Sequence, residues 1–185
     1  EYLVISISFE GIGDVIFNDE KLFCQTFLKN SAKAIRIIDK DNSNKLLGYC
    51  GKVTNLDELS DYLNEFIEEF KKISENIESL VDLSKAISRF IKIIDKEIIL
   101  IIDEVDKSSN NQLFLNFLGM LRNNYLDREK GKVVTFKSVI LAGVYDIKNL
   151  KLKLRPDEEK KYNSPWNIAV PFNIDMSLSK TGIKN

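Results

Sequence analysis

The sequence contains no histidine, and this absence removes several kinds of site at once. A Ser-His-Asp triad, a Cys-His dyad and a histidine zinc site all need an imidazole. The two cysteines, Cys24 and Cys50, show no metal-ligand spacing, and we interpret them as reduced, unpaired thiols. Any site chemistry therefore has to rest on other side chains.

The sequence also lacks long apolar runs and an excess of charge of one sign. A membrane span needs a run of about 18 apolar residues, and there is none. The first residues show no basic region before an apolar core, so they do not form a signal-peptide pattern. Lys and Arg total 27 against 28 Asp and Glu, which gives no overall positive field for nucleic acid. We therefore expect a cytoplasmic protein with no membrane partner, and direct nucleic-acid binding is not indicated.

Glycine and proline are scarce, with 8 and 3 residues, and 44% of the residues are hydrophobic. This composition is typical of one globular domain. Apolar periodicity predicts strands and helices in alternation, which is the pattern of an α/β fold with a parallel sheet. The expected strands are 2–9, 98–102 and 136–143. The expected helices are 18–38, 55–79, 82–96 and a fourth that follows a capping cluster at 107–111. Residues 39–44 are interpreted as a loop.

The most informative ten residues are Glu97 to Asp106, EIILIIDEVD. The unbroken apolar run predicts a strand buried on both faces, and Asp103 and Glu104 follow at its carboxyl end. Ligands of open α/β sheets bind beyond the carboxyl ends of the strands. Nucleotide hydrolysis needs one acid to hold Mg²⁺ through water and another to orient or deprotonate the attacking water. We assign Asp103 to magnesium and Glu104 to the catalytic water, the pattern called Walker B; the alternative is a buried strand that merely ends in a charged turn.

A phosphate-binding loop, G-x-x-x-x-G-K-S/T, is missing from the 185 residues. Residues 48–54, GYCGKVT, come nearest, but the two glycines are too close together. In addition, Val53 stands where a magnesium-binding hydroxyl is needed. We interpret this segment as a turn, and we expect the chain to be a fragment that begins after a phosphate-binding loop and its helix.

Polar side chains also follow the strand expected at 136–143. Tyr145 and Asp146 follow it after Val144, at a position where an ATPase of this architecture places a polar side chain near the γ-phosphate. Two interpretations stay open, because either residue could act as this sensor or both could begin a turn. Arg155 lies in a charged segment that is either a solvated connection or carries an arginine turned toward the nucleotide.

The string LIIDEVD at Leu100 to Asp106, together with GVYDIKNLK and NSPWNIA within Leu141 to Ser179, resembles the predicted AAA-ATPase-like family. The resemblance covers essentially the whole chain, 1–185, as a single domain truncated before residue 1. It implies a three-layer α/β fold, in which helices flank a parallel sheet, and a partial P-loop NTPase core of the additional-strand (AAA/ASCE) type. It also implies ATP and Mg²⁺ as cofactors.

Members of this family are commonly bacterial, and they often carry a PD-(D/E)XK nuclease-like domain after the ATPase. The resemblance therefore implies such an attached domain as a partner in the full-length protein. In the resembled fold, the strand before the P-loop lies between the strand at 136–143 and another near Asn167 to Val170. Without it, two strand edges would be unpaired, so we expect this chain alone to be poorly soluble or a homo-oligomer.

Two functions remain open on the sequence. In the first, the chain carries the Walker B and sensor half of an ATP-binding and hydrolysis site and needs an upstream P-loop. Alternatively, it is a degenerate interaction or scaffold domain that does not hydrolyse nucleotide. A P-loop upstream in the parent gene favours the first, and a natural start near Glu1 favours the second.

Overall fold

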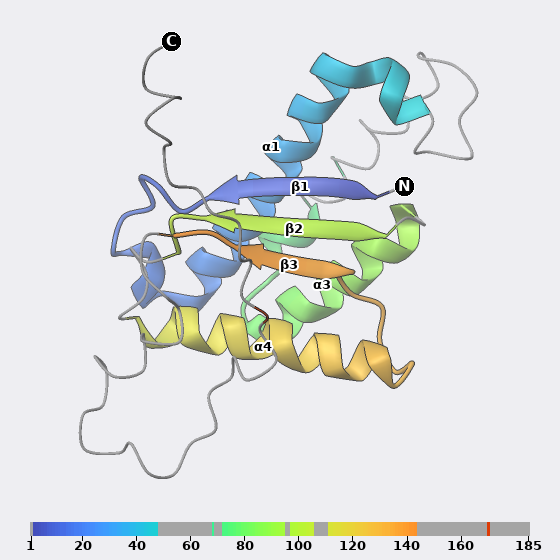
Figure 1. The fold of residues 1–185 in the computed structure, drawn as a ribbon. Coiled ribbons are helices and arrows are strands. Elements are labelled where there is room, and N and C mark those ends of the chain that lie inside the picture. The colour runs from blue at the N-terminus through green and yellow to red at the C-terminus, as the bar shows by residue number, and fades with distance from the viewer. Residues whose placement is uncertain are drawn as a thin grey trace, which may run out of the picture.

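The computed structural model describes residues 2–47, 68, 72–94, 97–105, 111–143 and 170. Three strands, β1 (Leu3–Ser8), β2 (Ile98–Asp103) and β3 (Ser138–Leu141), form a parallel sheet in the order β1-β2-β3. Figure 1 shows the three arrows side by side and pointing the same way. The predicted α/β class and parallel sheet are confirmed at this level.

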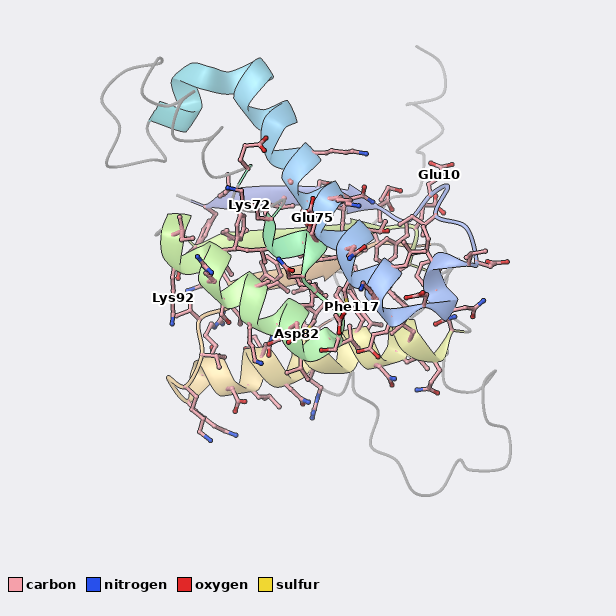
Figure 2. All side chains as sticks on the ribbon, turned by 180° about the vertical axis from the view of Figure 1, so that it is seen from behind. Glu10, Lys72, Glu75, Asp82, Lys92 and Phe117 are labelled. Atoms are coloured by element: carbon pink, nitrogen blue, oxygen red, sulfur yellow. The ribbon has the colours of Figure 1, made fainter. Side chains whose placement is uncertain are left out.

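The helices are η1 (Ile16–Asn18), α1 (Glu20–Leu47), α3 (Leu80–Ile94) and α4 (Gln112–Glu129). Residues 72–75 form a further helical turn. In Figure 1 the strands lie in front of α1 and α3, and in Figure 2, seen from behind, these helices lie in front of the sheet. They therefore cover one face of the sheet.

One face of the sheet carries the core, because side chains alternate along each strand. Leu3, Ile5 and Ile7 of β1 are buried, whereas Val4, Ser6 and Ser8 are exposed. On β2, Ile98, Leu100 and Ile102 are fully buried and the alternate Ile99 and Ile101 only partly. The prediction that β2 is buried on both faces is thus confirmed for one face, while the other face is only partly buried. Within the described residues the molecule has two layers, and a third layer over the other face stays a prediction.

Aromatic packing joins the helices to the sheet. Phe9, which directly follows β1, makes edge-on contacts with Phe17, Phe23 and Phe114, with ring centroids 5.6–6.1 Å apart. The ring centroid of Phe117, a residue of α4 labelled in Figure 2, lies 5.1 Å from the ring centroids of both Phe23 and Phe27 of α1. Because Phe9 lies on the buried face, these contacts place η1, α1 and α4 on that same side.

Two helix starts follow local capping rules. Asn111 accepts hydrogen bonds at Oδ1 from the backbone N–H of Leu113 (2.8 Å) and Phe114 (3.2 Å), which confirms the cap expected within 107–111. At α3, the Ser79 Oγ accepts from the Asp82 N–H (3.2 Å) and donates to the Asp82 carboxylate (2.8 Å). Ser79 therefore caps the start of α3, with its hydroxyl held by the Asp82 carboxylate, and the helix starts two residues before the predicted Asp82.

The expected end of the first helix near Ile38 is wrong, as is the loop expected at 39–44. Helix α1 continues to Leu47. Asp, Asn and Ser weaken a helix by only a few tenths of a kcal/mol each. No Gly or Pro occurs between Glu20 and Leu47, and Gly48 is the first of either after Gly13. The polar residues at 39–44 alone therefore do not end the helix.

The connection from α4 to β3 is held by Arg128. Its Nη1 donates to the carbonyl oxygens of Phe136 (2.7 Å) and Lys137 (2.6 Å), and its Nη2 pairs with Glu129 (2.8 Å). The guanidinium also lies 5.0 Å from the ring centroid of Tyr125. At the same end of the sheet, Lys137 pairs with Glu97 at 2.6 Å, which links the entries to β2 and β3.

Two remaining predictions, a strand and a helix, fall mostly on residues outside the described part of the chain. The strand expected near Asn167 to Val170 has only Val170 in the described part, and Val170 is exposed and not in a strand. The helix expected at 55–79 is helical at 68 and 72–75 and has ended by Asn76, and its other residues before 72 lie outside the described part. None of the described helices combines the length and apolar character that crossing a membrane requires.

Candidate functional site

The carboxyl ends of β1 and β2 meet at one edge of the sheet. The parallel register pairs Ser8 with Asp103, and the Phe9 N–H donates to the Asp103 carbonyl oxygen at 3.1 Å. The register between β2 and β3 pairs Ile102 with Leu141, so β3 ends at the same edge. Asp103 and Glu104 therefore lie where open α/β sheets bind ligands, as their position in the sequence predicts.

Asp103 ends β2 with an exposed side chain. Its Oδ1 accepts a hydrogen bond from the backbone N–H of Glu104 at 2.9 Å. Because strand side chains alternate, Asp103 projects from the same face as Ile99 and Ile101, away from the helices. The assigned magnesium residue is thus accessible at the sheet edge.

Glu104 has a φ of +58°, the only positive φ of a residue other than glycine in the described part of the chain. This left-handed conformation costs about 1–2 kcal/mol for a residue with a Cβ. Hydrogen bonds on both sides enforce it, because the Asp103 carbonyl is bound by Phe9 and the Val105 N–H donates to the Ala142 carbonyl oxygen at 3.1 Å. Val105 is also fully buried, which fixes the chain after the turn. Strands β1 and β3 together hold Glu104 in its strained conformation.

The first turn beyond β1 borders the same edge. The Ser8 Oγ accepts from the Glu10 N–H at 3.0 Å, and the Ile12 N–H donates to the Phe9 carbonyl oxygen at 3.2 Å. Gly11 adopts a φ of +74°, a conformation that glycine tolerates without a steric cost. Glu10, labelled in Figure 2, lies in this turn.

Ser8 is a site residue that the sequence reasoning missed. Its hydroxyl is exposed, and its register partner is Asp103, so it lies on the same face of the sheet as the proposed magnesium residue. The alternation of Leu3, Ile5 and Ile7 with Val4, Ser6 and Ser8 contains the signal. However, the signal becomes specific only when β1 is known to pair with β2 in parallel and to end level with it.

The exposed Asp103 carboxylate is compatible with a hydrated magnesium ion, which takes only one or two carboxylates from a protein. In the described residues, no group of three or more His, Cys, Asp or Glu side chains could hold a metal ion. Magnesium usually keeps several waters and takes one or two carboxylates together with phosphate oxygens. An exposed Asp103 at the sheet edge provides a carboxylate of this kind.

Three of the predicted site residues, Tyr145, Asp146 and Arg155, lie outside the described residues. The structure therefore brings together two of the five predicted residues, Asp103 and Glu104. The last described residues before the predicted sensor are Ala142 and Gly143. The Ala142 N–H donates to the Ile102 carbonyl oxygen at 2.8 Å, so the chain leaves β3 beside the end of β2.

No family model, curated protein or solved structure matches this chain.

Proposed function

We propose that this chain is an AAA-type ATPase-like domain that carries the Walker B and sensor half of an ATP-binding and hydrolysis site. A phosphate-binding loop from an upstream segment would complete the site. The observation that carries the proposal is the location of Asp103 at the carboxyl end of the central strand of the described sheet, with Glu104 directly after it.

The conformation of Glu104 supports a functional role for its side chain. Strained backbone conformations concentrate at functional sites, where the surrounding structure over-determines them. Here the restraint comes from two neighbouring strands, through Phe9 and Ala142. A turn without function at this point would tolerate glycine, which removes the strain. The backbone that carries the assigned water-orienting residue is instead held in one conformation.

In this proposal, the Asp103 carboxylate would hold Mg²⁺ through its water shell. The cation would neutralise charge on the ATP phosphates. Glu104 would accept a proton from, or orient, the attacking water. Tyr145 and Asp146 are the proposed sensor candidates, and Arg155 is the candidate arginine for the nucleotide. The Ser8 hydroxyl, level with Asp103, is available to hydrogen-bond the water shell.

The test is calorimetry of Mg²⁺-ATP binding by this chain and by a version extended upstream through the next strand and loop. The proposal expects binding by the extended form only. Binding by neither form would overturn it and favour a degenerate interaction or scaffold domain.

Hydrolysis is tested separately in the extended form with Glu104→Gln. Glutamine keeps the size of the side chain and removes the carboxylate. ATP should still bind, and turnover should fall about 100-fold or more, as expected for loss of a general base. Glu75→Gln is the matched control, because Glu75 is exposed on the helical turn at 72–75, away from the sheet edge (Figure 2). Equal turnover by both variants would remove Glu104 from its proposed role.

A further inference from the structure

No further inference is drawn: the strongest candidate, the partly apolar sheet face formed by Val4, Ile99, Ile101 and Ile140 opposite the helices, is an unpartnered surface, and nothing in the described part of the chain shows what covers it.

Discussion

Ser8 and Asp103 are register partners at the point where β1 and β2 end. The Phe9 N–H donates to the Asp103 carbonyl oxygen, so the two strand ends are tied together by backbone. A displacement of β1 would therefore also move the proposed magnesium residue. The turn after β1, which begins at Ser8, belongs to the candidate site as much as the Asp103-Glu104 pair does.

The strain at Glu104 predicts that glycine stabilises the chain there. Glu104→Gly relieves about 1–2 kcal/mol of left-handed strain. It also adds unfolded-state entropy that costs about 0.5–1 kcal/mol. We expect Glu104→Gly to be more stable than Glu104→Ala by a few tenths to about 1 kcal/mol in urea unfolding. An alanine variant at least as stable as the glycine variant would contradict the left-handed conformation.

The aromatic cluster predicts a large loss of stability for Phe117→Ala. Phe117 is fully buried between α1 and α4. Truncation should lower the free energy of unfolding by about 3–5 kcal/mol, whereas Phe117→Leu should cost about 1.5 kcal/mol or less. Val15→Ala, at a side chain that is 73% exposed, is the control and should change little. Similar losses for the alanine and leucine variants would argue against tight packing around this ring.

The hydrogen bonds between Ser79 and Asp82 at the start of α3 predict a stability difference that depends on pH. The hydrogen bond from Ser79 is the main cause that lowers the pKa of Asp82, and the Glu78 backbone and Lys85 act in the same direction. Folded Asp82 therefore holds a proton less tightly than unfolded Asp82. Its stabilising contribution is fully present above the ordinary aspartate pKa of about 4, and it is lost as the pH falls through that value toward the lowered pKa.

The measurement is the unfolding free energy of the native chain and of Asp82→Asn between pH 7 and pH 2. The native chain should be the more stable at pH 7, and the difference should narrow below about pH 4. Glu75→Gln removes an exposed carboxylate away from this cap and is the control. A difference that stays constant over the whole range would show that the charge of Asp82 contributes nothing.

The burial of Cys24 predicts an unreactive thiol. Burial, followed by the nearby charges of Glu20 and Asp82, raises the pKa of Cys24 to about 12. At pH 8 about one molecule in ten thousand would carry the thiolate, which is the reactive form. In a Cys50→Ser variant, a thiol reagent should label Cys24 only as denaturant unfolds the chain. Rapid stoichiometric labelling in native buffer would contradict this packing.

The edge position of β3 predicts self-association of the chain. β3 forms an edge of the described sheet, its four residues are uncharged, and Ile140 is 45% exposed. Uncharged, exposed edge strands favour pairing between molecules. Ile140→Lys should weaken association several-fold in sedimentation velocity. Val81→Lys, at a 64% exposed position on α3, is the control and should leave association unchanged. A compact monomer at all concentrations would contradict the prediction.

Local patterns in the sequence were sufficient for most of the strands and for the cap of α4. The apolar run before Asp103 identifies β2, and Asn111 identifies a helix start, because both signals act within a few residues. The continuation of α1 beyond Ile38 was missed because polar residues resemble a loop until the absence of glycine and proline from this stretch is weighed. The cap at Ser79 was within reach of the sequence, since Ser-x-x-Asp before an apolar run is a signature of a helix start.

The geometry of the site could not be derived in this way. The sequence predicts that Asp103 and Glu104 emerge at a strand end, which the structure confirms. Ser8 is 95 residues away from Asp103 in the chain, and only strand pairing brings the two level. The left-handed φ of Glu104 depends on hydrogen bonds made by Phe9 and Ala142, which directly follow the neighbouring strands β1 and β3. These are tertiary effects that no local pattern encodes.

The guanidinium of Arg128 has a further consequence for how the fold responds to acid. The two hydrogen bonds from Arg128 to the carbonyl oxygens of Phe136 and Lys137 involve no carboxylate. The start of α3 depends instead on a carboxylate, Asp82. Acidification should therefore weaken the hydrogen bonds at the start of α3 first. The Arg128 hydrogen bonds that join α4 to β3 should remain.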